Sequence, residues 1–562
     1  MSVDEKSNIS PFGSPDGADS DISDIMKEFV DFNRNVFSSG IATAINSRTR
    51  VIIGTKGSGK TIYLRRLREE LKKEPSISIQ HIKEVDNQNY VAKRDGSFHI
   101  TEKVIWFTTE QDKRTVTVNW QKVWDRAILL AIASNMLGYF GDKFEALFDV
   151  DDNQKGRISK SYYKRLLDVL SDGLPEELFS LGREESLSIL NFVEIILEKY
   201  SSIKKLKNYL NDAKWHEFKK ALTNILSKMP PVWFFVDCVD EEYRSAPIPW
   251  MCCQQGLFYT VMEYARDNSF TNRVHIVICI RDQVMYKVKM SEHSQRYKDD
   301  LHIKFLSWNY NSIKYFFEKK IELLDDSYFC DSSNGKTIEN WLGVSQIENK
   351  THKINEKVVD YIIRHTSMIP RDIVIMGNEL SKIPSTLKKS TDKNPLFEMI
   401  RDIVHSCSED SGFEMLKFSL NHIRTNYSKA EKISTNYIHN NPKEWFEADS
   451  DELNKLKEII RSLKTDRFSY DVLQQAMQLA DSIFGTNSHV FDILWVNGAI
   501  GYIKKNIYNH TEKEVWASIE NSSTTTLPLR KEQYLLRSCI VDAVGHEFIQ
   551  TSKKPIIGGE VL

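Results

Sequence analysis

The stretch "VIIGTKGSGKTIYLRRL", residues 51–67, decides how the first half of this chain folds. The apolar run 51–53 predicts a short buried strand, and the apolar positions that follow recur at helical spacing. Between strand and helix, residues 54–61 match the P-loop pattern G-x-x-x-x-G-K-S/T. The sequence therefore predicts a strand, a phosphate-binding loop and a helix in succession.

Each P-loop position has a chemical reason. Glycines let the backbone curl so that its N–H groups point at a phosphate, next to the positive end of the following helix. We expect Lys60 to reach the β- and γ-phosphates and the Thr61 hydroxyl to ligate Mg²⁺. The residues expected to hold the nucleotide are Gly54, Thr55, Lys56, Gly57, Ser58, Gly59, Lys60 and Thr61. A glycine turn beside a solvated lysine is the alternative, and the strand–loop–helix context disfavours it.

Bulk composition limits the class of protein. A chain of 562 residues is long enough for two to four domains. Its net charge of −2 gives no overall attraction to nucleic acid or membrane, so such a contact would need a local patch. Seven cysteines without a C-x-x-C pair fit a reducing cytosol better than a disulfide framework or a cysteine zinc site. We expect a soluble cytoplasmic protein without a membrane partner, with a disordered, Ser-, Asp- and Gly-rich tail over residues 1–23.

Further apolar runs indicate more strands. Residues 230–237, 272–281 and 301–306 read as short buried strands, and 78–119, including "RTVTVNW", as strands or a hairpin. Residues 120–229 are predominantly helical in pattern. Apolar strands separated by helices predict an α/β fold, with a parallel sheet wrapped by helices.

A P-loop needs an acidic partner at the end of a neighbouring strand, and "VWFFVDCVDEEYR" supplies one. Asp237 ends the apolar run and is the expected carboxylate on the magnesium side. Many ATPases place a catalytic Glu next, but Cys238 cannot act as a base, so Asp240 or Glu241 would have to polarise the water. We therefore expect the protein to hydrolyse nucleotide slowly. Arg281, which ends the strand at 272–281, would face the γ-phosphate; the alternative is pairing with a surface carboxylate.

The order of P-loop, "FFVDCVDE", "ICIRD", "LHIKFLSW" and "TSMIPRDIVIMGNEL" resembles the AAA+/STAND branch of P-loop ATPases, and within it bacterial initiator- and KAP-like proteins. This resemblance covers about residues 45–385. It implies ATP and Mg²⁺ as ligands, hydrolysis of ATP to ADP and phosphate, and Asp240 as the base. It also makes residues 369–380 a lid segment, in which Pro370 packs near the adenine and Arg371 senses the γ-phosphate. The alternative for the latter two is a Pro in a first helical turn and a solvated Arg. Arg296 stands where such proteins keep an arginine finger that acts on a neighbouring subunit.

The resemblance also sets the expected domain boundaries. They are an ATPase core over 24–308 with a helical insert near 125–228, a helical lid over 309–385, a helical linker over 386–464 and a winged-helix-like domain over 465–562. In the last domain, "HVFDILWVNGAIGYIKK" would be a helix running into the wing. Lys504, Lys505, Arg530 and Lys531 could contact DNA phosphates. Equally, the domain could pack on its own core or on a partner protein.

Two functions from different classes stay open. The protein is either a DNA-associated oligomeric ATPase, or a nucleotide-gated switch that senses a protein trigger and recruits a separate effector. Relatives of this type often resemble components of bacterial antiviral defence. A small-molecule kinase is disfavoured because it would not need the C-terminal half.

Two other segments resemble binding sites. Residues 151–162 resemble an EF-hand loop, but Lys155 and Tyr162 stand where calcium needs oxygen ligands, so we expect a turn. The lysine-rich segment 201–220 could line a nucleic-acid groove, although such a helix more often faces water.

Overall fold

The computed structural model describes most of the chain and leaves several segments undescribed. The described residues are 10–17, 19–29, 49–71, 90–94, 113–145, 188–200, 202–226, 232–237, 247–267, 270, 273–291, 294–297, 300–331, 335–349, 354–427, 450–486, 488–505, 512–517, 525–545 and 560–561. The EF-hand-like segment 151–162 lies outside them.

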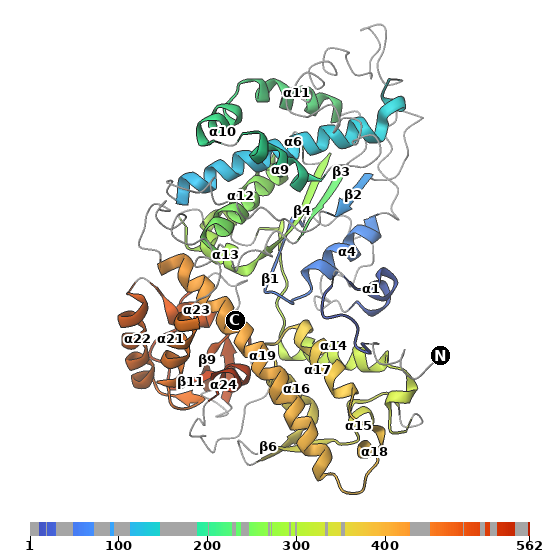
Figure 1. Cartoon of the computed structure of the whole chain (residues 1–562), viewed down its shortest axis with the longest axis vertical. Helices are drawn as coiled ribbons and strands as arrows, with labels where there is room; N and C mark the ends of the chain where they lie inside the picture. Colours follow the sequence, from blue (N-terminus) through green and yellow to red (C-terminus); the bar gives the residue numbers. More distant parts are fainter. Residues whose placement is uncertain are drawn as a thin grey trace.

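A five-stranded sheet forms the centre of the N-terminal half (Figure 1). Its strands are β1 (Val51–Gly54), β2 (Tyr90–Arg94), β3 (Val232–Val236), β4 (Val274–Arg281) and β5 (Ile303–Phe305). They lie in the order β2-β3-β4-β1-β5, and every neighbouring pair is parallel. The α/β class and the strands expected from the apolar runs 51–53, 230–237, 272–281 and 301–306 are confirmed.

Helices cover both faces of this sheet. On one face, α6 (Lys113–Glu145), α9 (Ile189–Lys199), α12 (Pro247–Arg266) and α13 (Asp282–Lys289) share the largest hydrophobic core with the strands. On the other face, α4 (Lys60–Leu71) packs through Leu64 and Leu67. The chain therefore leaves β1 towards one face and the adjacent strand β4 towards the other. Such a divergence opens a crevice at the carboxyl ends of the two strands, where ligands bind in open α/β sheets.

One segment expected to be extended is helical. The expectation of a strand at "RTVTVNW" is wrong, because residues 113–120 form the first turns of α6. Val116 and Trp120, one helical turn apart, are fully buried, and the same face continues with Val123, Trp124 and Ala127. Packing of this face against α12 outweighs the extended preference of the alternating Thr and Val residues.

The lysine-rich segment 201–220 faces water, as expected. It forms α10 (Ile203–Leu210) and the start of α11 (Lys214–Leu226). Leu206, Tyr209 and Trp215 are buried in the core, while the lysines at 204, 205 and 207 are exposed. The aromatic side chains are therefore not available to stack on bases.

The described residues of 309–385, the segment expected to form a lid and called the lid below, have their own hydrophobic core. The elements of the lid are α14 (Tyr310–Glu322), η4 (Asp326–Tyr328), α15 (Ile338–Leu342), the antiparallel pair β6 (Gln346–Asn349) and β7 (Ile354–Lys357), α16 (Val358–Arg364), α17 (Pro370–Ser381) and α18 (Ser385–Lys388). The lid is therefore mostly helical, with one added hairpin.

The expectation of a disordered tail over residues 1–23 is wrong for the part that the structure describes. Residues 10–17 and 19–21 contact the lid helix α17 and the P-loop helix α4, and α1 (Ile22–Glu28) follows. Phe12 is 1% exposed and packs between Phe317 and Trp341 of the lid core. Its ring lies against Gly377 of α17, where a Cβ atom would come within 2.5 Å of it. One buried aromatic side chain fixes a segment whose composition is typical of disorder.

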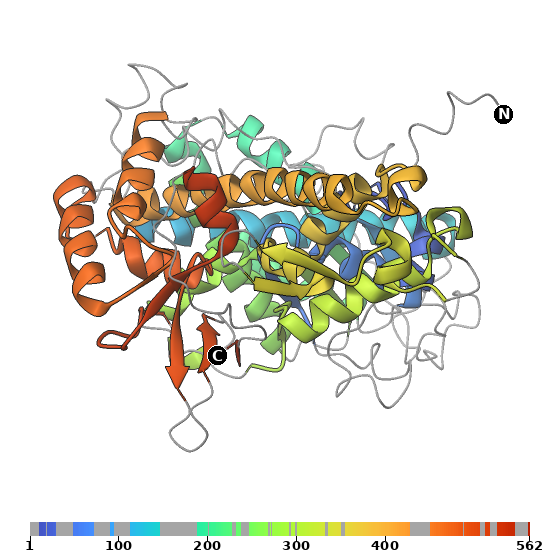
Figure 2. The same cartoon turned by 90° about the horizontal axis from the view of Figure 1, so that it is seen from below.

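The helix α19 (Asn394–Tyr427) belongs to two cores (Figures 1 and 2). Its first half contributes Leu396, Ile400 and Val404 to the lid, and its second half contributes Leu416 and Leu420 to the C-terminal domain. The expected separate linker over 386–464 is therefore divided between these two units, because α21 (Ser450–Arg461) also packs in the C-terminal core.

In the C-terminal domain, α23 (Val490–Val496) is followed by a pair of antiparallel strands, and the winged-helix assignment stays a prediction. The remaining elements are β8 (Arg467–Phe468), α22 (Tyr470–Phe484), α23 (Val490–Val496), β9 (Ile500–Lys505), β10 (Glu512–Trp516), β11 (Tyr534–Leu536), α24 (Ser538–Val544) and β12 (Glu560–Val561). The order is β12-β10-β9-β11-β8, so β11 lies between β8 and the β9–β10 hairpin. Residues 534–536 form the strand β11, and α24 follows it in the chain.

Candidate functional site

A cavity of about 700 Å³ lies at the carboxyl edge of the central sheet. It is lined by the P-loop and the start of α4, the ends of β3 and β4, the segment after β5, α14, the start of α17, and the N-terminal residues 13–17 and 19–29. Its volume is typical of a site for a ligand of nucleotide size. The sequence-predicted residues Lys56, Gly57, Ser58, Gly59, Lys60, Thr61, Asp237, Arg281, Pro370 and Arg371 all line it.

The P-loop backbone is curled as its glycines predict. Gly57 and Gly59 have φ angles of +85° and +93°, which residues with a side chain rarely adopt. The Lys60 ammonium donates hydrogen bonds to the carbonyls of Gly54 and Thr55, each at 2.9 Å. The Ser58 hydroxyl is buried and has no hydrogen-bond partner among the described residues. A lysine held over its own loop, at the start of a helix whose first turn has no acidic residue, is a suitable place for a phosphate.

Two charged side chains reach the cavity from the sheet. Asp237 follows β3 and Arg281 ends β4, and each is only 3% exposed. The register aligns Arg281 with Gly54 of β1, so the guanidinium projects from the strand next to the P-loop. The strand order β3-β4-β1 therefore places the Arg281 cation between the P-loop and the Asp237 carboxylate.

A third charged residue at this edge was missed. Asp282 begins α13 directly after Arg281 and is 3% exposed. Burial raises the pKa of Asp282, while the positive charges of Lys60 and Arg281 lower it. An acidic residue directly after a buried strand was the sequence signal that could have identified it, as it did for Asp237.

The lid contacts the P-loop directly. The backbone N–H of Arg371 donates a hydrogen bond of 3.3 Å to the carbonyl of Gly57. Pro370 occupies the first turn of α17, whose amino end faces the cavity. Because the amino end of a helix is positive, α17 adds to the potential that attracts an anion here.

The N-terminal segment closes another side of the cavity and was not expected at this site. Arg65 of α4 donates hydrogen bonds of 2.7 Å to the carbonyls of Gly17 and Ser20. The Arg371 Nε atom donates to the carbonyl of Pro15 at 3.1 Å. This segment therefore bonds to both the P-loop helix and the lid helix, and its only sequence signal is the aromatic anchor in "SPFGSP".

An aromatic residue from the segment after β5 completes the wall. The indole N–H of Trp308 donates a hydrogen bond of 3.0 Å to the Ser58 carbonyl. The Trp308 ring contacts Phe316 edge-on, with 5.7 Å between the ring centroids, and both line the cavity. These rings provide an apolar surface of the kind that a nucleobase stacks on.

Five predicted residues are not among those that line the cavity: Gly54, Thr55, Asp240, Glu241 and Arg296. Cys238, Asp240 and Glu241 lie outside the described residues, so the choice of catalytic base stays a prediction. Arg296 lies on the short helix η3 (Ser294–Tyr297), is exposed and does not line the cavity. Its role on a neighbouring subunit also stays a prediction.

These groups define what the cavity can bind. Thr61 and Asp237 offer oxygen atoms for a divalent cation, and five cationic side chains can neutralise a polyphosphate; they are Lys56, Lys60, Arg281, Lys320 and Arg371. The donors are arranged for a ligand with a flat apolar end and an anionic end.

No protein-family model matches the sequence, and no curated protein matches it significantly. In the described part of the chain, none of the helices combines the length and apolar character needed to cross a membrane. The function is therefore inferred from the geometry of the cavity.

Proposed function

We propose that the protein binds ATP with Mg²⁺ in this cavity, hydrolyses it slowly, and acts as a nucleotide-gated switch of the AAA+/STAND type. The observation that carries the proposal is the convergence of Lys60, Thr61, Asp237, Arg281 and Arg371, from separate elements, on one cavity. A single P-loop pattern would not require that convergence.

In this proposal, the P-loop N–H groups and Lys60 bind the phosphates, and Thr61 and Asp237 hold Mg²⁺. Held by these two residues, the metal would supply positive charge that offsets the negative charge of the phosphates. Lys60 exchanges its bonds to the loop carbonyls for bonds to phosphate oxygens, which are stronger because both partners are charged. Trp308 and the N-terminal segment enclose the other end of the nucleotide.

In this proposal, Arg281 transmits the change in nucleotide state from the cavity to α19. Its guanidinium carbon lies 5.1 Å from the ring centroid of Phe418, which belongs to the C-terminal half of α19. A γ-phosphate competes with this ring for the guanidinium, because a cation–π contact is worth less than a charge-assisted hydrogen bond. Arg371, on the lid, responds to the γ-phosphate in the same way. Nucleotide state thereby changes the position of α19 relative to the sheet.

A DNA-associated oligomeric machine, with or without a role in antiviral defence, is the second candidate. Lys504 and Lys505 are exposed at the end of β9, where phosphates could reach them, although Lys505 forms an ion pair of 2.6 Å with Glu532. Lys531 lies over the ring of Tyr502 on the same strand. However, α22 and α23, the helices that would approach a groove, contain neither Lys nor Arg. DNA binding of this kind depends on cations that neutralise phosphates, so the switch is the better-supported function.

The test is ATP binding and turnover by the purified protein, with and without duplex DNA, with Lys60→Ala as the blank and Asp237→Asn as a variant that keeps shape but not charge. We expect binding that Lys60→Ala abolishes, slow turnover that Asp237→Asn lowers further, and no effect of DNA. Strong stimulation by DNA would favour the second candidate. Absence of ATP binding would contradict both.

A further inference from the structure

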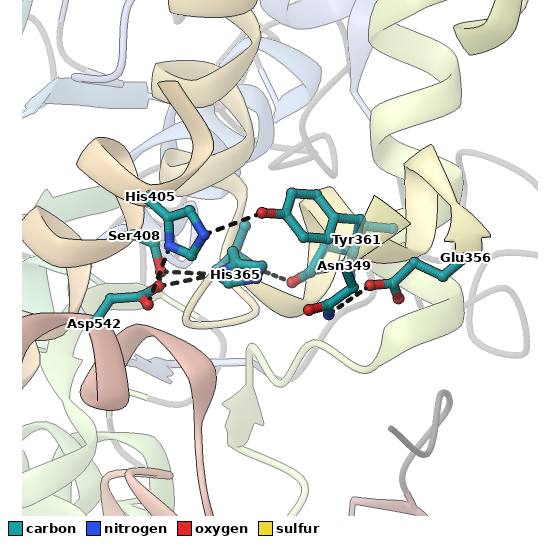
Figure 3. Close-up of polar contacts among 9 residues, drawn as sticks. Asn349, Glu356, Tyr361, His365, His405, Ser408 and Asp542 are labelled. Atoms are coloured by element: carbon teal, nitrogen blue, oxygen red, sulfur yellow. Dashed lines mark hydrogen bonds and ion pairs between the residues drawn. The ribbon is translucent and has the colours of Figure 1, made fainter. Parts of the chain in front are cut away.

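A polar cluster connects the lid to the C-terminal domain, and none of its residues is among those that line the cavity (Figure 3). His365 ends α16, His405 and Ser408 lie on α19, and Asp542 lies on α24. Asp542 is more than 130 positions away in the chain from each of the other three residues, yet their side chains point at one another. In the proposed function the ATP site has no need of this cluster.

The cluster has the chemistry of a metal site. The Nδ1 atom of His365 lies 2.9 Å from one carboxylate oxygen of Asp542, and the Nδ1 atom of His405 lies 3.2 Å from the other. All three ligand atoms lie within 4.8 Å of one another. In a tetrahedral zinc site, bonds of about 2.0–2.2 Å place neighbouring ligand atoms about 3.3–3.5 Å apart. The two histidine–carboxylate distances lie within a few tenths of an ångström of that spacing. The two histidine nitrogens, within 4.8 Å of each other, reach it by approaching by up to about 1.4 Å.

The surroundings of the cluster also suit a metal. The hydroxyl of Tyr361 lies 3.1 Å from the Nε2 atom of His405, on the side of the ring away from Asp542. Histidines that bind zinc through one ring nitrogen commonly use the other for such a hydrogen bond, which fixes the orientation of the ring. Ser408 Oγ donates a hydrogen bond to Asp542 and lies 3.4 Å from the Nδ1 atom of His365.

We propose that His365, His405 and Asp542 bind a zinc ion that fastens the C-terminal domain to the lid. Two imidazole nitrogens and one carboxylate favour zinc over calcium or magnesium, which prefer oxygen ligands. A water molecule completes the coordination, beside Ser408. Because the three ligands come from three helices, the ion holds α24 against α16 and α19, and its binding adds to the stability of this junction.

The test uses the full-length protein after chelation and dialysis, titrated with Zn²⁺ by calorimetry and with Co²⁺ by visible absorption. We expect one ion per chain, the absorption of tetrahedral Co²⁺, and at least a hundredfold weaker binding in both His405→Ala and Asp542→Asn. Tyr361→Phe, which keeps every ligand, should weaken binding about 10–100-fold. The matched control is His489→Ala, since His489 forms a similar pair with Asp492, at 3.2 Å, outside the cluster.

His405 has 42% of its side-chain surface exposed, so the His405→Ala variant tests the ligand without emptying a core position. Near-ultraviolet circular dichroism of each variant verifies its fold. Failure of the folded wild-type protein to bind Zn²⁺ or Co²⁺ would overturn the proposal, as would binding that survives in both ligand variants. The cluster would then be a hydrogen-bonded contact only. Metal binding does not involve ATP, so either result leaves the proposed function to its own test.

Discussion

Replacing Gly57 by Ala should separate the lid from the P-loop, and Gly59→Ala is its matched control. Both glycines have left-handed φ angles, so alanine at either site costs about 1–2 kcal/mol of backbone strain. A Cβ atom at position 57 would lie 2.8 Å from Arg371 Cβ and 2.9 Å from Ile369 Cδ1. A Cβ atom at position 59 would meet nothing within 4 Å. Only Gly57→Ala is therefore expected to displace the lid.

The difference between the two variants measures the lid contact. Overpacking of this kind costs about 1–3 kcal/mol, and α17 must shift because the clashing Arg371 atom is close to its backbone. If a closed lid is needed to hold ATP, Gly57→Ala should bind a non-hydrolysable ATP analogue about 5–150-fold more weakly than Gly59→Ala, at 1.4 kcal/mol per factor of ten.

Two assays test this expectation. One is the dissociation constant of the analogue for each variant. The other is amide hydrogen exchange over residues 370–381 without nucleotide, which should accelerate in Gly57→Ala and stay unchanged in Gly59→Ala. Equal affinities together with equal exchange would refute the reasoning, because the lid would then not depend on the contact with Gly57.

Three further outcomes follow from other contacts. Phe418→Leu removes the ring beside Arg281 but keeps an apolar side chain. It should leave ATP affinity within about threefold and reduce the nucleotide-dependent change in hydrogen exchange along α19. An unchanged exchange response would exclude signalling through the Arg281–Phe418 contact. Phe12→Ala removes a buried anchor worth about 3–5 kcal/mol, so trypsin should cleave after Lys27 much faster, and equal cleavage rates would show that the segment is held by other contacts. Burial lowers the pKa of Lys388 from 10.5 to about 8, so the unfolded chain binds more protons than the folded protein between these pH values. The free energy of unfolding should therefore rise with pH across this window, by up to about 3 kcal/mol. The melting temperature of Lys388→Met should lack this rise, and parallel pH profiles of melting temperature for the variant and the wild-type protein would contradict the prediction.

The parts of the site that sequence predicts well are those set by local rules. The P-loop, the strands that end at Asp237 and Arg281, and the start of α17 each combine a short apolar run or a Pro with a charged residue nearby. In a parallel sheet, such strand ends meet at one edge, so their convergence follows from the pattern.

The parts that sequence does not predict depend on contacts between distant residues. Phe12 is placed by lid residues more than 300 positions away, and composition alone argued for disorder. Val116 and Trp120 lie in a segment that alternates like a strand, and only packing against α12 makes it helical. The cluster around Asp542 joins three helices whose separation in the chain hides it from any motif.

Because α19 continues through two cores, a small rotation at one end of the helix produces a large displacement at the other. Its 34 residues span roughly 50 Å, so a tilt of about 10° near the lid would carry the far end by on the order of 9 Å. A change of a few ångströms at the nucleotide would thus become a displacement of the whole C-terminal domain. The same continuity restricts how the protein can change during evolution. Inserting one residue between the two cores would rotate the C-terminal domain by about 100° about the helix axis, so the length of this helix between the cores must be kept.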